Sequence, residues 1–312
     1  MKKWFIVALL LLLTALAAIY VFIPRRVHIS SIGYTNCTPA AAFRFLGDES
    51  KWRQWWPVQQ PGAASGNAFV YNGDVYGISK KMYNNLDVTI AGGSTVIDSR
   101  LALLPLPADS LAFQWQCDLE TGNNPFARVA QYRRAVQLKK SMDAILLQLG
   151  SFLGKKENVY GFSIERTSTT DTLLVATKSI LPAYPATTDV YALVNILRDY
   201  IGSQGAAETN APIMNVTKLG DQQFQLMVAI STDRVLPGAG QVSFRKMIPG
   251  HFMVANIKGG DHAVVEAMQQ MHTYFDDYKK TSMAIPFAAL ITDRTKEPDS
   301  SKWLTRIYAP VY

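Results

Sequence analysis

Apolar and polar positions divide the chain into one long apolar run and a body in which two periodicities alternate. The run extends from Trp4 to Ile23. Val27–Tyr34 then alternates between apolar and polar residues, which predicts a strand. Thr38-Pro39 has the form of an N-cap followed by a first-turn proline, so a short helix is expected from there to about Leu46.

The rest of the first half predicts several strands followed by one long helix. The strand candidates, separated by glycines, are 68–71, 80–87, 95–104 and 110–119. After Pro125 the apolar residues are spaced for one helical face: Leu138, Met142, Ile145, Leu149 and Phe152. Gly154 is expected to end this helix, and residues 155–158 are expected to form a linker.

The second half contains a weak internal repeat. A strand at 172–181, a helix and strands at 213–219 and 223–231 are followed by a strand at 242–258, a second helix and strands at 286–292 and 303–311. Asp189 and Asp261 are interpreted as cap-type residues at the two helix starts. A β-α-β-β unit used twice predicts an α+β domain with two equivalent helices on one sheet.

Composition narrows the class of protein. With 312 residues, 48% of them hydrophobic and 18% charged, the chain is globular and long enough for two domains. The net charge of +7 is spread along the sequence, so it does not indicate a nucleic-acid partner. Cys37 and Cys117 form no C-x-x-C motif, which argues against a zinc ribbon, a redox dithiol or a disulfide scaffold. Two separate buried thiols are expected, although pairing in an oxidising compartment stays open.

The apolar run suits a single membrane-spanning helix. Twenty helical residues span about 30 Å, and charged residues flank both ends. A cleaved signal peptide, with Ala15-Leu16-Ala17 as its cleavage site, is the alternative, but the run continues past Ala17. We therefore expect an uncleaved single-pass anchor at residues 1–25, in a membrane of the bacterial inner-membrane type. Lys2 and Lys3 favour an extracytoplasmic body, whereas Arg25 and Arg26 favour the opposite orientation; of the two, we expect the extracytoplasmic one.

Residues 26–155 resemble the START-like (SRPBCC, polyketide cyclase) helix-grip family. The matching features are the opening strand, the helix that starts at Pro39, the segment from Asp48 to Pro57 with Trp52 and Trp55, the following strands and the long amphipathic helix. The resemblance implies a curved antiparallel sheet around the long C-terminal helix, with an apolar ligand cavity between them.

Residues 156–312 resemble the gyrase-inhibitor-like effector-binding domain, the AraC-type effector-binding family. The resemblance rests on the duplicated β-α-β-β order, Tyr184 through Tyr191, Pro249-Gly250 and the ending from Trp303 to Val311. It implies a groove between the repeats for small lipophilic, often cationic molecules, and some members hydrolyse reactive ligands. The family's glutamate after a Pro-aromatic pair is missing, because Pro286-Phe287 precedes Ala288, so cation recognition is in doubt. No helix-turn-helix precedes the domain, so a transcription factor is not expected.

Aromatic side chains are the ligand-binding candidates. Tyr191, Tyr274, Trp303 and Tyr308 in the second domain and Trp52 and Trp55 in the first would attract a flat apolar ligand, although plain core packing explains each of them as well. His262 and Glu266 lie four residues apart on a helix, but two ligands do not make a metal site. No catalytic residue, metal or cofactor is expected.

Three hypotheses remain. The favoured one is a membrane-anchored protein that binds, senses or sequesters apolar small molecules, cationic ones included. It would contact the membrane through the N-terminal helix, and no nucleic-acid partner is expected. The alternative is a hydrolase of reactive lipophilic xenobiotics in the effector-binding domain, with Tyr191, Glu266 or His251 as acid or base, but no paired base and nucleophile is evident. In the third, both folds serve protein contacts only.

Overall fold

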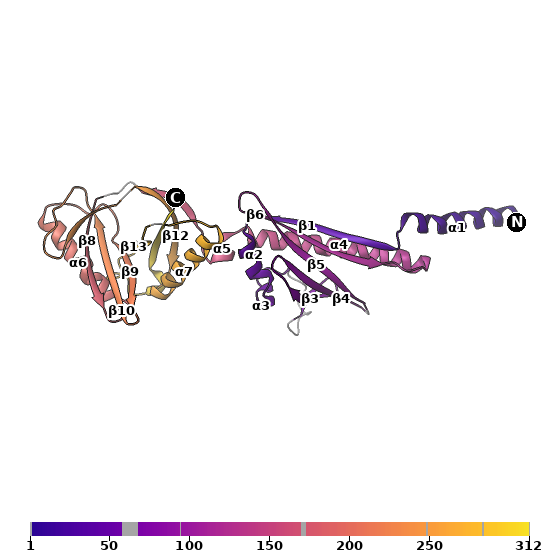
Figure 1. The fold of residues 1–312 in the computed structure, drawn as a ribbon, viewed down its shortest axis with the longest axis horizontal. Coiled ribbons are helices and arrows are strands. Elements are labelled where there is room, and N and C mark those ends of the chain that lie inside the picture. Colours follow the sequence, from indigo (N-terminus) through magenta and orange to yellow (C-terminus); the bar gives the residue numbers. More distant parts are fainter. Residues whose placement is uncertain are drawn as a thin grey trace. The chain divides into compact units, whose positions relative to one another are not determined.

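The computed structural model describes residues 2–57, 68–93, 95–169, 173–247, 249–282 and 284–311. The chain forms two compact units, Met1–Lys155 and Lys156–Tyr312. Each unit is built on a curled antiparallel sheet with helices packed against it (Figure 1). The predicted α+β class is therefore confirmed, together with the apolar N-terminal helix.

The N-terminal helix, α1, runs from Lys2 to Phe22. Its segment Lys3–Phe22 is long and apolar enough to cross a membrane, by length and composition only, and none of it is buried by the rest of the protein. Exposing a helix with a mean hydropathy of 2.8 to water is unfavourable, because its apolar surface gains free energy only when it is removed from water. This confirms that an apolar helix of the expected length is present, and the membrane itself stays a prediction.

The first unit continues with a six-stranded sheet and one long helix. Its elements are β1 (Arg26–Thr35), α2 (Pro39–Leu46), α3 (Glu49–Trp52), β2 (Phe69–Tyr71), β3 (Asp74–Lys81), β4 (Asn85–Gly92), β5 (Thr95–Leu106), β6 (Ser110–Glu120) and α4 (Pro125–Leu153). The strand order is β1-β6-β5-β4-β3-β2, and α4 packs on β1 and β6. Thr38 caps α2 as expected, since its hydroxyl accepts a hydrogen bond from the Ala41 amide.

Two glycines let α4 lie very close to β1. A Cβ atom at Gly150 would stand 2.6 Å from the Tyr34 carbonyl oxygen, and one at Gly33 would stand 3.0 Å from the Leu146 Cβ. The helix face predicted from the sequence fills the interface, with Leu138 and Met142 among its fully buried residues. Larger side chains at the two glycines would separate the layers and open a costly cavity.

Two local expectations for the first unit are wrong. The predicted strand 80–87 spans a hairpin instead, because β3 ends at Lys81 and β4 begins at Asn85. The predicted linker at 155–158 contains the start of a short helix, α5 (Lys156–Tyr160). Val159 and Tyr160 are buried, so tertiary packing holds a segment whose polar beginning resembles a linker.

The second unit consists of an eight-stranded sheet and two main helices. Besides α5, its elements are β7 (Glu165–Thr169), β8 (Leu173–Leu181), α6 (Thr187–Ser203), β9 (Ile213–Gly220), β10 (Gln223–Ser231), β11 (Ser243–Lys246), β12 (Gly250–Lys258), α7 (Asp261–Asp277), β13 (Phe287–Leu290), the 3-10 turn η1 (Ser300–Lys302) and β14 (Leu304–Val311). The strand order is β11-β8-β10-β9-β13-β14-β12-β7.

The two repeats are visible in this order. β8-α6-β9-β10 and β12-α7-β13-β14 follow one another in the chain, and β9 meets β13 at the centre of the sheet. Thr187 begins α6 and Asp261 begins α7, 74 positions later, and the same separation relates Met214 to Ala288. Met214 and Ala288 are direct cross-strand partners, so an approximate two-fold axis passes between them.

Three details of the repeat differ from expectation. The predicted strand 242–258 is two strands, since β11 pairs with β8 of the first repeat and β12 pairs with β14 of the second. Pro249 precedes β12, and a proline has no amide hydrogen to continue a ladder.

Neither Asp189 nor Asp261 is an N-cap: Asp189 lies in the first turn and accepts from the Ala186 amide at 2.9 Å, while Asp261 is the first helical residue. β7 was not expected, and Thr172 of the predicted strand lies outside the described residues.

Candidate functional site

A groove of about 240 Å³ lies in the second unit between α7 and the two strands that meet at the centre of the sheet. We call it the β9–α7 groove. Met214 and Val216 of β9 form its floor with Ala288 of β13, and α7 contributes Val265 and Met268. Strand and helix come from different repeats, so the groove exists only because the duplicated units pack around their central strand pair.

Two polar side chains also line the groove, and they differ in what they offer a ligand. Asn215 donates to the Pro286 carbonyl at 2.9 Å and accepts from Thr217 at 2.8 Å, so half of its amide's hydrogen-bonding capacity is already used. The Tyr184 ring packs edge-on against Phe224 with the ring centres 5.9 Å apart. Burial raises the pKa of Tyr184, with a further contribution from Asp261. The Tyr184 hydroxyl is therefore neutral at physiological pH and can donate a hydrogen bond to a ligand.

The groove contains no acidic side chain among its described lining residues. Ala288 is buried and presents only a methyl group to the groove. A cation moved into such a groove would lose its hydration without gaining an ion pair, which is unfavourable. The site is therefore suited to a neutral apolar molecule with one hydrogen-bonding group.

A second cavity of the same unit, of about 490 Å³, lies beside α6 and the end of β13. Tyr191, Arg198, Glu208 and Asp293 line it. The Arg198 guanidinium is 3.0 Å from the Glu208 carboxylate and 3.8 Å from that of Asp293. The hydrogen bond from Thr295 holds the pKa of Asp293 below its usual range, so this carboxylate stays charged. The charged side chains that line this cavity are thus paired with one another, and the cavity is open and polar.

Two of the sequence candidates, Tyr191 and Trp303, belong to a network around one buried arginine. The Arg294 side chain is 1% exposed and its Nη1 lies 2.5 Å from the Asp261 carboxylate. The Arg294 guanidinium also donates to Thr305 at 3.1 Å and stacks 4.5 Å from the Trp303 ring centre. The Tyr191 hydroxyl accepts a hydrogen bond from the Arg294 amide at 2.8 Å. Both aromatic residues thereby help to hold the loop between β13 and β14 against α6 and α7.

The other two candidates of this unit pack among aromatic rings. Tyr274 is buried between Tyr160 and Tyr278, with ring centres 5.3 and 4.5 Å away. Tyr308 stacks on Phe287 at 4.8 Å. Of the four candidates only Tyr191 lines a described cavity, and a ligand-binding role for them stays a prediction. Tyr184, which lines the β9–α7 groove, was not among the sequence candidates. The signal that could have indicated it is its place at the start of the segment Tyr184 through Tyr191, on which the resemblance to the effector-binding family partly rests.

In the first unit, Trp52 and Trp55 are each 2% exposed. The Trp52 ring stacks parallel to that of Trp56 at 5.3 Å, and its indole nitrogen donates to the Leu46 carbonyl at 2.8 Å. The Trp55 indole nitrogen is buried and has no hydrogen-bond partner among the described residues. These tryptophans line none of the described cavities, so contact with a ligand remains a prediction for them as well.

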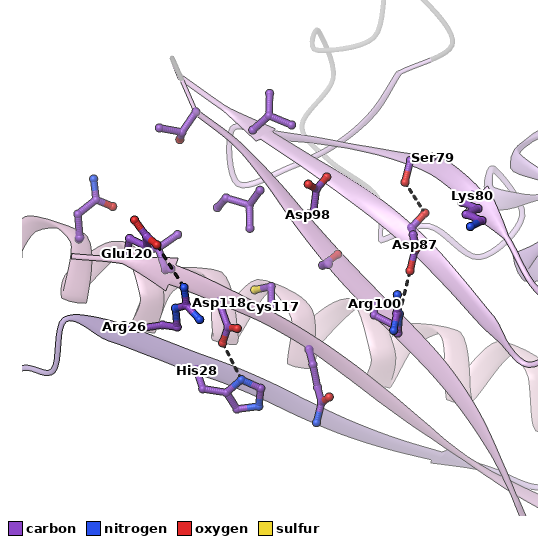
Figure 2. A pocket seen from close by; sticks show the side chains of 17 residues that line it. Arg26, His28, Ser79, Lys80, Asp87, Asp98, Arg100, Cys117, Asp118 and Glu120 are labelled. Atoms are coloured by element: carbon purple, nitrogen blue, oxygen red, sulfur yellow. Dashed lines mark hydrogen bonds and ion pairs between the residues drawn. The ribbon is translucent and has the colours of Figure 1, made fainter. Parts of the chain in front are cut away.

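The first unit also has an open depression of about 930 Å³ on the exposed face of its sheet (Figure 2). Figure 2 shows cross-strand ion pairs of Arg26 with Glu120 at 3.3 Å and of Arg100 with Asp87 at 3.0 Å, and a hydrogen bond between His28 and Asp118 at 2.8 Å. Lys80 and Asp98 balance one another in formal charge. Positive and negative groups alternate across this surface, and with His28 neutral its formal charge is only −1, which gives it little power to select an ion.

The residues considered for hydrolysis lie on three separate elements. Tyr191 is on α6, His251 on β12 and Glu266 on α7, and no hydrogen bond joins any two of them in the described part of the chain. No group of three His, Cys, Asp or Glu residues converges to hold a metal ion, within those same residues. Both cysteines are buried and form no disulfide within the described residues, and separate buried thiols are what the sequence predicts.

Comparisons with known proteins give weak likenesses to solved structures. No family model and no curated protein matches the chain. The EcmrR C-terminal domain is 13% identical, covers 48% of this chain and 98% of its own, and has a TM-score of 0.43. SAV2435 bound to tetraphenylphosphonium is 15% identical, with 48% and 94% coverage and a TM-score of 0.33. A hydrolase encoded by lin2189 from Listeria innocua is 12% identical, with 48% and 92% coverage and a TM-score of 0.36.

These neighbours are consistent with the predicted resemblance of residues 156–312 to effector-binding domains. They do not bear on the START-like resemblance of residues 26–155. At such identities and scores they assign no function to this chain.

Proposed function

We propose that this chain is a membrane-anchored binding protein for small apolar molecules and that the β9–α7 groove is its ligand site. The apolar character of the groove carries the proposal: Met214, Val265 and Met268 surround a volume whose described polar side chains are Tyr184 and the partly used amide of Asn215. A site with apolar walls and few polar groups favours ligands by apolar burial and orients them by one hydrogen bond.

The proposed ligand is neutral, flat and small. A volume of about 240 Å³ is below the usual size of drug-binding pockets, so the groove suits a molecule with about two fused rings. Met268 has an unbranched, flexible side chain on the wall of the groove, and its movement would admit somewhat larger ligands. Ala288 supports the preference for neutral molecules over cations, since a buried cation would find no carboxylate beside it.

The N-terminal helix supplies the membrane part of the proposal. An exposed apolar segment of 20 residues matches the thickness of a bilayer, and a lipid surface concentrates apolar molecules near the protein. The binding unit would thus sample ligands that partition into the membrane. Sensing and sequestration both follow from such an arrangement.

The test is a calorimetric titration of the full chain in lipid nanodiscs, with empty nanodiscs as the reference for partition into lipid. The two probes are 2-naphthol, which is neutral at pH 7, and trimethyl(2-naphthyl)ammonium, which carries the same ring with a permanent positive charge. We expect saturable binding of 2-naphthol and at least tenfold weaker binding of the cation, a difference of about 1.4 kcal/mol. Equal heats with loaded and empty nanodiscs would contradict ligand binding, whereas preference for the cation would contradict the proposed ligand class.

A further inference from the structure

The last turn of α1 is attached to the start of α4. The Tyr20 hydroxyl donates a hydrogen bond to the Asn123 carbonyl at 2.7 Å. The Arg128 guanidinium lies over the Tyr20 ring, 4.8 Å from its centre. A second connection follows two residues after α1, where the Thr121 hydroxyl donates to the Pro24 carbonyl at 2.8 Å and the Thr121 amide to the Arg25 carbonyl at 2.8 Å. Figure 1 shows the end of α1 beside the start of α4.

These contacts fix the height of the first turn of α4 relative to a membrane. Tyr20 is three residues before Ile23, the last residue of the apolar run, so it lies about 4.5 Å inside the end of that run. If α1 spans the bilayer, Tyr20 is in the interfacial zone where amphipathic aromatic rings are stable. Residues hydrogen-bonded to Tyr20 or stacked on it are necessarily in the same zone.

The first turn of α4 has the chemistry of a membrane-interfacial surface. Phe126 is 82% exposed, and the neighbouring end of α1 exposes Val21 and Phe22. Asn124 caps the helix by accepting from the Phe126 amide at 2.9 Å, so the backbone that presents this ring is fixed. A large aromatic side chain that is almost fully exposed is unfavourable in water and favourable at the boundary between headgroups and acyl chains.

Basic residues surround this apolar surface. Arg25 and Arg26 are exposed next to the end of α1, and of the two Arg26 pairs with Glu120 at 3.3 Å. Arg128 is 4% exposed, its Nε atom has no hydrogen-bond partner, and no carboxylate pairs with it among the described residues. An unpaired buried guanidinium is costly, and the negative potential of anionic headgroups would lower that cost.

We propose that the N-terminal end of α4 is a second membrane-contact element, in which Phe126 inserts into the lipid interface beside α1 and the exposed Arg25 lies at the level of anionic headgroups. The first unit would then rest directly on the bilayer instead of hanging from a flexible tether. This inference rests on the membrane anchor in the proposed function, and it adds a lipid-contacting surface on the folded body.

The experiment measures the depth of single spin labels by power-saturation EPR, on the full chain in nanodiscs of phosphatidylcholine and phosphatidylglycerol. Labels are placed at Phe126→Cys, at Leu10→Cys in the middle of α1, and at Leu147→Cys. Leu147 is the matched control, since it is 75% exposed and on the same helix, 21 residues and about 32 Å farther along. Cys37 and Cys117 are buried and are kept, and the unsubstituted chain shows any label that they take up.

We expect the ratio of oxygen to nickel-chelate accessibility at position 126 to be several-fold higher than at position 147, and highest at position 10. An equal ratio at positions 126 and 147, with position 10 deep in the bilayer, would overturn the inference and leave the anchor intact. A water-accessible label at position 10 would refute the anchor and, with it, both the membrane part of the proposed function and this inference. Ligand binding by the groove is measured separately and does not depend on this result.

Discussion

Met214 and Ala288 face one another as direct partners across the centre of the eight-stranded sheet, and both line the β9–α7 groove. They are also equivalent positions of the two repeats, because their separation of 74 positions is also that between the starts of α6 and α7. The groove therefore lies beside the approximate two-fold axis of the duplication. A substitution at either residue acts directly on the proposed ligand site.

Ala288→Glu tests how the groove selects ligands by charge. The new carboxylate would project into the groove. We expect the variant to bind trimethyl(2-naphthyl)ammonium about tenfold more tightly than the unsubstituted chain does, a gain in binding free energy of roughly 1.4 kcal/mol. Burial would raise the pKa of this glutamate, and only the ionised form attracts the cation, so the gain is expected to grow as pH rises. Calorimetric titration at two pH values measures it.

Ala288→Gln is the control for that experiment, since it has the same shape without the charge. It is expected to leave the affinity for the cation close to that of the unsubstituted chain. A gain as large with glutamine as with glutamate would show that shape, not charge, controls binding, and no gain with either would place the cation outside the groove.

Arg294→Met tests the buried network at the start of α7. The substitution removes the ion pair with Asp261 and the stacking on Trp303. Removing one partner of a buried pair costs about 3 kcal/mol or more, which corresponds to a fall of roughly 6–12 °C in the Tm of a unit of this size. Thermal unfolding of the full chain in detergent, followed by near-UV circular dichroism, measures the shift.

Lys302→Met is the matched control for Arg294→Met. Lys302 pairs with Asp299 at 3.4 Å, but both side chains are largely exposed, so solvent screens the interaction. We expect a change within about 1 kcal/mol. Similar Tm values for the two variants would mean that the Arg294 network does not stabilise the second unit.

Cys117 is expected to make the stability of the first unit depend on pH in the alkaline range. Burial, with a smaller contribution from Asp118, raises the pKa of the Cys117 thiol from 9.0 to about 11. A raised pKa in the folded state means that the folded chain keeps a proton that the unfolded chain loses. The stabilisation is complete below pH 9 and is lost as pH rises from about 9 towards 11.

Urea unfolding of the chain and of Cys117→Ala at pH 8 and pH 10.5 checks this expectation. The unsubstituted chain is expected to lose about 1–2 kcal/mol more than the variant between the two pH values. Tyr76, whose pKa is also raised by burial, is present in both chains, so the difference isolates Cys117. Parallel pH profiles would indicate that the thiol is hydrated in the folded protein.

Regular elements with strong periodicity could be predicted from the sequence. The long helix that became α4 was predictable because Leu138, Met142, Ile145 and Leu149 repeat at helical spacing and Pro125 and Gly154 mark its ends. The duplicated order of the second unit was predictable because the same period change occurs twice. The helix caps were less certain, since Asp189 is as favourable in the first turn as at the N-cap.

The groove could not be predicted to the same degree, because it depends on which strands become neighbours. Nothing local in the sequence says that β9 and β13 pair, and this pairing brings Met214, Ala288 and α7 together. Burial of Tyr274 and the contacts of Tyr191 with the Arg294 loop were hidden for the same reason. An aromatic residue on a helix face has the same sequence signature whether it faces a ligand or a core.

The most direct test of ligand binding in the β9–α7 groove is the affinity of Val265→Trp for 2-naphthol. Val265 is exposed on the groove wall, so a tryptophan there would fill the groove without disturbing the core. Gln269→Trp is the control, because residue 269 is exposed on α7 and does not line the groove. Calorimetric titration in nanodiscs is expected to show at least a tenfold loss of affinity for Val265→Trp and none for Gln269→Trp. Unchanged affinity in Val265→Trp would contradict the assignment of the ligand site to this groove.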